Sequence, residues 1–146
     1  MYSHNLELQS YSHYNQSMTH PLGASFIEKL AIIDYRIKRW NLNLKLIQST
    51  SGGNVDTNNI NYGHDILVSY STGDRMEYNN EIAQGNTTDI QIVDIKLAYL
   101  INPITNMKFE LGAVFRNESS IFASEIQSDF YYFSFKTDLR NLYYDF

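Results

Sequence analysis

The sequence contains no cysteine, and only two prolines and seven glycines occur among its 146 residues. Without cysteine, disulfide frameworks and thiolate metal sites are excluded. Charged residues make up 18 % of the chain, below the roughly 25 % usual for soluble domains. The formal net charge is −5, and this acidic balance argues against nucleic acid as the main partner.

A long hydrophobic run is also missing, and the mean hydropathy is −0.36. A helical membrane span, which needs about 18 or more consecutive apolar residues, is therefore excluded. Membrane-spanning strands are not excluded, because their polar face weakens the hydropathy signal. The opening residues MYSHN are not basic, and no apolar segment of a signal peptide follows them. We therefore expect either a cytoplasmic protein or a piece of a longer precursor.

Aromatic residues are abundant, with 12 tyrosines and 8 phenylalanines, as is typical of strands. The clearest pattern spans residues 90–115, where apolar and polar side chains alternate on both sides of a turn at residues 102–106. The apolar face of this predicted hairpin carries Val93, Ile95, Leu97, Tyr99 and Ile101, and then Met107, Phe109, Leu111, Ala113 and Phe115. Similar alternation predicts further strands over residues 2–11 (weakly), 26–37, 40–47 and 130–139.

The connections between these strands alternate in length. Residues 12–25, 48–89 and 117–128 form long connections, and residues 38–39 and 102–106 form short ones. Long outer loops and short periplasmic turns are typical of transmembrane β-barrels, and this pattern assigns residues 65–71 to an outer loop. Tyr35, Trp40 and Tyr99 lie beside short turns, as an interfacial aromatic belt would. We therefore predict an all-β fold, an antiparallel up-and-down transmembrane β-barrel segment with about six spanning strands.

Six strands are too few for a closed barrel, since the smallest bacterial barrels have about eight. We therefore expect residues 1–146 to be the C-terminal portion of a larger barrel in the cell outer membrane. Its partners would be membrane lipid and the remaining strands of the same barrel. The alternative is a soluble β-sandwich or a lipocalin-like ligand-binding protein.

Four stretches carry a family resemblance over nearly the whole chain: YSHYNQSMTHPLGASFIEKLAIIDYRIKRW, NYGHDILVSY, YLINPITNMKFELGAVFRNES and the final TDLRNLYYDF. They resemble the C-terminal region of outer-membrane barrels from Bacteroidetes, of the Wzi-like capsule-assembly and RemB-like gliding-motility kind. The resemblance implies a non-enzymatic role in capsule polysaccharide assembly or attachment, or in gliding-associated functions of the cell surface. The partners that it implies are surface polysaccharide or other surface proteins.

The outer loop of residues 12–23, with Tyr11 at its edge, is the best candidate for a binding site, because loops on a rigid scaffold often carry function. It offers aromatic faces beside imidazoles and amides, which would suit a saccharide or a protein surface. The candidate residues are Tyr11, His13, Tyr14, Asn15 and His20, together with Gln16. The alternative is an ordered loop that fills the barrel lumen.

Motifs of catalysis and of metal binding are absent from the sequence. The four histidines show no metal-binding spacing, and no serine-hydrolase elbow or phosphate loop occurs. We therefore expect no enzymatic activity, no cofactor and no metal. The polar face carries charges of both signs, which we expect to pair across neighbouring strands. These residues are Asp34, Arg36, Lys45, Asp94, Lys96, Lys108, Glu110, Arg116 and Lys136.

Overall fold

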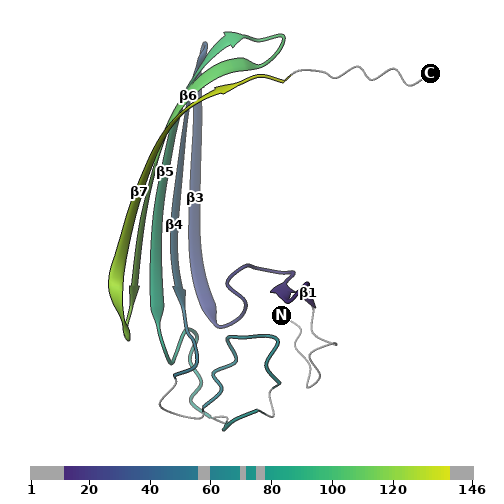
Figure 1. Ribbon diagram of the computed structural model, residues 1–146, viewed down its shortest axis with the longest axis vertical. Helices are drawn as coiled ribbons and strands as arrows, with labels where there is room; N and C mark the ends of the chain where they lie inside the picture. The colour runs from purple at the N-terminus through teal and green to yellow at the C-terminus, as the bar shows by residue number, and fades with distance from the viewer. Residues whose placement is uncertain (1–11, 56–59, 70–71, 75–77, 139–146) are drawn as a thin grey trace, which may run out of the picture. The chain divides into compact units, whose positions relative to one another are not determined.

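The computed structural model describes residues 12–55, 60–69, 72–74 and 78–138, and these form an all-β fold (Figure 1). The long strands are β3 (Phe26–Ile37), β4 (Trp40–Ser51), β5 (Thr88–Asn102), β6 (Met107–Ser120) and β7 (Ala123–Lys136). Two short strands, β1 (Ser12–His13) and β2 (Gln16–Ser17), precede them. The strand predicted over residues 2–11 lies outside the described residues. No helix in the described part of the chain is long and apolar enough to cross a membrane.

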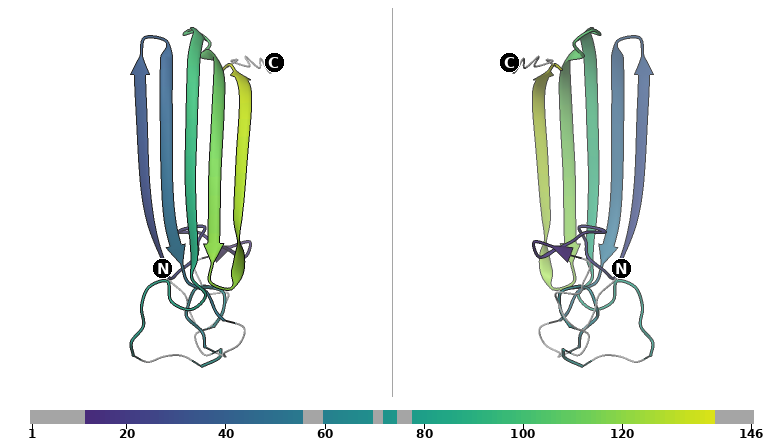
Figure 2. Two further views of the ribbon diagram at one scale, coloured as in Figure 1. Left: turned by 90° about the vertical axis from the view of Figure 1, so that its left-hand side faces the viewer. Right: turned by 90° about the vertical axis from the view of Figure 1, so that its right-hand side faces the viewer.

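The five long strands form one sheet in the order β3-β4-β5-β6-β7, and neighbouring strands run in opposite directions (Figure 2). Every strand therefore pairs with its neighbours in the sequence, which is the up-and-down connectivity that the sequence predicts. The all-β class and the antiparallel pairing are confirmed. Among the described strands, β3 and β7 each pair on one side and form the two edges of the sheet.

Several element boundaries fall where the alternation predicts them. Strand β3 covers the predicted residues 26–37, and the two short turns lie at residues 38–39 and 103–106. Residues 65–69 form no strand, in agreement with their assignment to a loop.

The prediction of a long loop over residues 117–128 is wrong. Residues 117–120 continue β6, residues 123–128 belong to β7, and the turn between them consists of Ile121 and Phe122. Strand β4 likewise extends over residues 48–51, which the sequence assigned to a loop. Both faces of these extensions are mainly polar, so the period-two hydrophobic signal of a strand is lost there. The alternation of long and short connections therefore breaks down at the last one.

The apolar face of the sheet is more exposed than its polar face, which is the reverse of the arrangement in soluble proteins. In the inner strands β4, β5 and β6, every exposed residue lies on the face of the predicted apolar series, and every buried residue lies on the opposite, polar face. Leu97 is 39 % exposed, whereas Asp94 and Glu110 are only 8 % and 6 % exposed. Soluble antiparallel sheets normally turn their apolar face toward a core. The hydrophobic side chains that are buried in the described residues are Ile66, Ala83 and Ala98.

The chain divides into two compact units. Unit 1 comprises Met1–Lys29, Gln48–Gln91 and Asn117–Ile126, and it contains the β1–β2 hairpin and the long connections. Unit 2 comprises Leu30–Ile47, Ile92–Arg116 and Gln127–Phe146, and it contains most of the amphipathic strand residues.

A hydrogen-bonded cluster on the polar face of unit 2 centres on Glu110. Its carboxylate accepts hydrogen bonds from the Tyr132 hydroxyl at 3.0 Å and from the Lys136 ammonium at 2.6 Å. The Tyr132 ring also covers Gly112, where an added Cβ would come within 2.2 Å of ring carbons. Aromatic coverage of a strand glycine helps to fix strand register, so this cluster ties β6 to β7.

The other charges on the polar face of unit 2 pair only in part as predicted. Lys96 lies 2.8 Å from Asp94, but this ion pair runs along β5 and not between strands. Asp34 makes no predicted ion pair, because its carboxylate oxygens accept hydrogen bonds from the amides of Asn41 at 2.9 Å and Asn43 at 3.1 Å. Hydrogen bonds to asparagine amides therefore take the place of the ion pair expected for Asp34.

Candidate binding site

The β1–β2 hairpin of unit 1 presents the first candidate residues. Tyr14 and Asn15 form its two-residue turn with φ angles of 49° and 58°, the left-handed conformations that such a turn requires. The Tyr14 side chain is 89 % exposed, and its ring lies edge-on to the His13 ring at a centroid distance of 4.3 Å. The turn therefore offers an aromatic pair to solvent.

His20 has a structural role in this loop. Its Nε2 lies 2.8 Å from the Glu28 carboxylate, and its Nδ1 accepts a hydrogen bond from the Leu22 backbone N–H at 3.2 Å. The imidazole also stacks on Phe26 with a centroid distance of 4.3 Å. A neutral imidazole that accepts at Nδ1 carries its proton on Nε2, where it can donate to Glu28. Both ring nitrogens are thus used within the chain.

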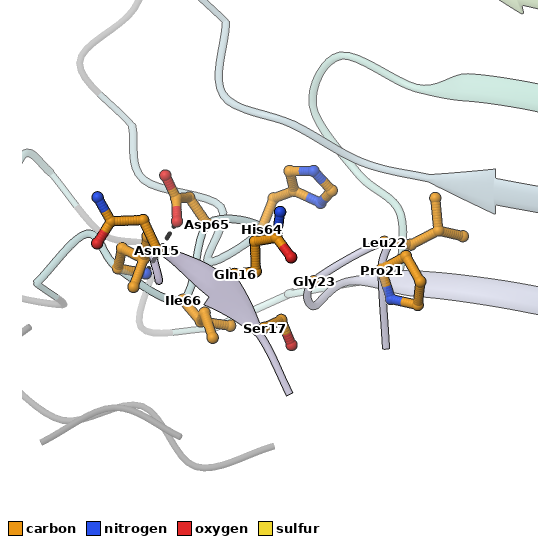
Figure 3. Close-up of a pocket in the computed structure, with 10 residues that line it drawn as sticks. Asn15, Gln16, Ser17, Pro21, Leu22, Gly23, His64, Asp65 and Ile66 are labelled. Atoms are coloured by element: carbon orange, nitrogen blue, oxygen red, sulfur yellow. Dashed lines mark hydrogen bonds between the residues drawn. The ribbon is translucent and has the colours of Figure 1, made fainter. Parts of the chain in front are cut away.

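A pocket of about 490 Å³ lies between this loop and residues 64–67 (Figure 3). Its lining residues are Asn15, Gln16, Ser17, Pro21, Leu22, Gly23, His64, Asp65, Ile66 and Leu67. Amide, hydroxyl, imidazole and carboxylate groups are set among proline, leucine and isoleucine side chains. A concave site with a few polar groups on an apolar lining is typical of small-ligand binding.

The two walls of the pocket are joined through the backbone. The Ala24 N–H donates a hydrogen bond to the His64 carbonyl at 3.1 Å, and the His64 Nδ1 lies 2.9 Å from the Ala24 carbonyl oxygen. Gly23 has φ +74°, and an added Cβ there would lie 3.0 Å from the His64 carbonyl oxygen, so this position favours glycine. Asp65 accepts a hydrogen bond from the Leu67 N–H at 2.8 Å, which closes a local turn.

The glycine pair at residues 52 and 53 supports the loops of unit 1 through close backbone approach. The Gly52 N–H donates to the Ser25 carbonyl at 2.9 Å, and the Gly53 carbonyl accepts from the Asn86 N–H at 2.8 Å. An added Cβ at Gly52 would lie 2.2 Å from the Gln84 carbonyl oxygen. Close packing therefore explains the glycine at position 52, whereas an added Cβ at Gly53 would make only an ordinary contact, 3.7 Å from the Asn86 carbonyl oxygen.

The structure distributes the predicted binding residues over different environments. Asn15 lines the pocket. His13 and Tyr14 lie next to it in the hairpin and face solvent. His20 is held by its contacts with Glu28 and Leu22 and does not line the pocket. Tyr11 lies outside the described residues.

Sequence reasoning missed the second wall of the pocket. It placed His64 in a separate outer loop, and it gave no role to Asp65, Ile66 and Leu67. No local spacing links residue 24 to residue 64, because the two residues pair over 40 positions through one backbone hydrogen bond and one contact of the His64 ring with the Ala24 carbonyl. The one sequence feature that marks this segment is the stretch NYGHDILVSY, which belongs to the family resemblance.

The polar groups of this pocket can donate and accept hydrogen bonds. Within the described ranges, no group of three histidine, aspartate or glutamate side chains is placed to hold a metal ion. The amides of Asn15 and Gln16, the Ser17 hydroxyl and the Asp65 carboxylate offer both donors and acceptors to a hydroxyl-rich ligand. Comparison of the chain with protein-family models, with curated protein sequences and with solved structures gives no match.

Proposed function

We propose that this chain is a segment of the wall of a non-enzymatic outer-membrane β-barrel, with its apolar face against lipid and its polar face toward the lumen. The observation that carries the proposal is the exposure of the apolar face beside a buried polar face. Burial of one large apolar side chain is worth about 1.5–3 kcal/mol. A whole strand face of such side chains therefore calls for an apolar cover, which a bilayer supplies.

The height of the apolar face supports a lipid cover. On β5 the apolar series runs from Val93 to Ile101, and on β6 it runs from Met107 to Phe115. Eight residue steps at about 3.3 Å each give roughly 26 Å of strand. A strand tilt of about 40° reduces this to roughly 20 Å, close to the ~25 Å apolar band of outer-membrane barrels.

The apolar series also gives way to polar residues at one end of the sheet in neighbouring strands. On the same face, the polar positions are Gln48 and Thr50 in β4, Asp89 and Gln91 in β5, Asn117 and Ser119 in β6, and Gln127 and Asp129 in β7. Because the strands are antiparallel neighbours, these positions all lie toward the same end of the sheet. A polar end shared by several neighbouring strands is what a bilayer surface would select.

Aromatic pairs lie at both edges of this apolar band. Trp40 and Tyr99 are in contact beside the short turns, with ring centroids 4.8 Å apart. Phe115 and Tyr131 form an edge-to-face pair at 5.7 Å at the other end of the band. Two aromatic girdles around an aliphatic band are characteristic of membrane-spanning barrels, so these pairs support the proposal.

We further propose that the outer loops of unit 1 bind surface polysaccharide, in capsule assembly or attachment or in gliding-associated surface functions. The support is the pocket lined by Asn15 and Asp65 with its neighbouring aromatic pair His13 and Tyr14, together with the resemblance to Wzi-like and RemB-like outer-membrane proteins. The partners that this function implies are a glycan, membrane lipid and the remaining strands of the barrel.

Substituting arginine on each face of the sheet tests the proposal that the apolar face contacts lipid. Leu97 lies at the centre of the apolar series on β5, so Leu97→Arg should lower the free energy of unfolding in lipid vesicles by about 2–4 kcal/mol. Asn43→Arg on the polar face should be tolerated, because a guanidinium there can replace the hydrogen bond to Asp34. Urea titration followed by Trp40 fluorescence measures both. Equal costs on the two faces, or a wild-type chain that is monodisperse without detergent, would contradict lipid contact.

A glycan array probed with the detergent-solubilised chain tests the loop function. Tyr14→Ala and Asn15→Gly should abolish the array signal, and the glycine keeps the left-handed turn at residue 15. Tyr78→Ala is the matched control, because Tyr78 is also highly exposed in unit 1 but lies outside the β1–β2 hairpin that borders the pocket. If the wild-type chain gives no signal, or if all three variants bind equally, the pocket is not a glycan site.

A further inference from the structure

A second, smaller cavity lies on the polar face of unit 2, at the end where the short turns are. Its volume is about 60 Å³, and Arg36, Lys38, Arg39 and Lys108 are among its lining residues. The other lining residues are Asn41, Ala98, Leu100 and Asn106. Its lining therefore contains four cationic side chains and no carboxylate.

Two carboxylates accept hydrogen bonds from amides that line this cavity. Asp34 accepts hydrogen bonds from Asn41 at 2.9 Å and from Asn43 at 3.1 Å. Asp138 accepts a hydrogen bond from Asn106 at 2.9 Å. Among the described residues, no ion pair joins any of the four cations to a carboxylate. The lining itself therefore carries four positive charges that make no ion pair within the described part of the chain, while the charges of Asp34 and Asp138 lie behind lining amides and Lys108 also interacts electrostatically with Glu110.

The backbone holds the Arg39 side chain in place and sets the turn that carries Lys38. The Arg39 guanidinium donates a hydrogen bond to the Ile101 carbonyl at 3.2 Å, and the Arg39 carbonyl accepts one from the Leu100 N–H at 2.8 Å. Lys38 has φ +52°, the left-handed conformation of a tight turn residue. This turn therefore fixes Lys38 and Arg39 beside the strand residues Arg36 and Lys108.

We infer that this cavity binds an oxyanion of phosphate size. A volume of about 60 Å³ has room for roughly four to six water-sized groups, at about 10–15 Å³ each, so it suits a single tetrahedral oxyanion group and not a nucleotide. Guanidinium groups bind phosphate oxygens in a planar, paired geometry, and lysines add compact charge. A bound dianion would also relieve the mutual repulsion of the four cations. The phosphate group is either free or carried by a lipid headgroup.

Titration of the full chain in detergent micelles tests the site. The readout is the fluorescence of Trp40, which is the neighbour of Arg39 and the single tryptophan of the chain. One arm adds inorganic phosphate, and the other adds a short-chain phosphatidylglycerol against a phosphatidylcholine control. Saturable binding in the first arm identifies a free anion, and saturation by phosphatidylglycerol alone identifies a lipid headgroup. Absence of saturable binding in both arms would overturn the inference.

Charge-neutral variants separate a specific site from general attraction. Arg36→Gln and Lys108→Gln should each weaken binding by roughly tenfold or more, since each removes a charge-assisted contact. Lys45→Gln is the matched control, because Lys45 is another strand lysine of unit 2 but does not line the cavity. Circular dichroism verifies that each variant is folded. Equal affinities in all three variants and the wild type would exclude this cavity as the binding site.

Discussion

In unit 2, regular strands bury Asp94 and Glu110 on one face and leave Leu97 and Leu111 exposed on the other. In unit 1, by contrast, irregular loops are held by hydrogen bonds to backbone groups and by glycines that allow backbone segments to touch. The stability of unit 2 therefore depends on what medium covers its apolar face. The stability of unit 1 depends on the close approach of backbone segments at its glycines. A single methyl group added at such a glycine should therefore destabilise unit 1.

The largest effect that we expect in unit 1 comes from Gly85→Ala. Gly85 has φ +89°, and an added Cβ would lie 2.2 Å from the Gly53 carbonyl oxygen and 2.7 Å from the Tyr62 ring. Strain in the left-handed region and the backbone clash together should lower the free energy of unfolding of unit 1 by roughly 3 kcal/mol. Faster chymotrypsin cleavage after Tyr62 would report this loss, while the emission of Trp40 in unit 2 should stay unchanged.

Gly63→Ala is the matched control for that variant. Gly63 also has a positive φ, +72°, but an added Cβ would meet nothing within 4 Å. Only the conformational strain remains, and it is worth about 1–2 kcal/mol. Equal effects of the two substitutions would show that the close approach at Gly85 does not stabilise unit 1.

The strands could be predicted from sequence wherever the two faces differ in polarity. Residues 26–37 and the turn at residues 38–39 were placed correctly because apolar and polar side chains alternate there. The β6–β7 hairpin around Ile121 was missed, since the ends of both strands are polar on both faces. Period-two alternation predicts a strand only where its two faces lie in different environments. It gives no signal where both faces of a strand lie in the same environment.

The candidate site could be predicted only in part for a different reason. The sequence shows that Asn15 and Tyr14 lie in a polar, aromatic turn, but it does not show that residues 64–67 form the opposite wall. That wall is set by the pairing of Ala24 with His64, through one backbone hydrogen bond and one contact of the His64 ring with the Ala24 carbonyl, and no motif in the sequence marks a pairing over 40 positions. The role of His20 was likewise hidden, because its partner Glu28 lies in the following strand.

An intermediate effect is expected for His20→Ala in unit 1. The variant removes the contact with Glu28 and leaves the Leu22 N–H without its acceptor, which should cost about 1–2 kcal/mol. Tyr14→Ala should change stability by less than about 0.5 kcal/mol, because that side chain is 89 % exposed. The rate of chymotrypsin cleavage after Tyr62, a site that both variants keep, compares the two. If His20→Ala is as neutral as Tyr14→Ala, His20 does not hold the loop.

The smallest effect that we expect comes from removing the hydroxyl of a tyrosine on β7. Two neighbouring tyrosines, one on each face of unit 2, allow the comparison. Tyr132→Phe removes the hydroxyl that donates to Glu110 at 3.0 Å and should lower the free energy of unfolding by about 1 kcal/mol. Tyr131→Phe should have almost no effect, because Tyr131 is 66 % exposed and its hydroxyl makes no hydrogen bond within the described residues. Urea titrations followed by Trp40 fluorescence resolve the difference. Equal losses would mean that the polar cluster around Glu110 contributes nothing specific, and that burial of the polar face does not stabilise the sheet.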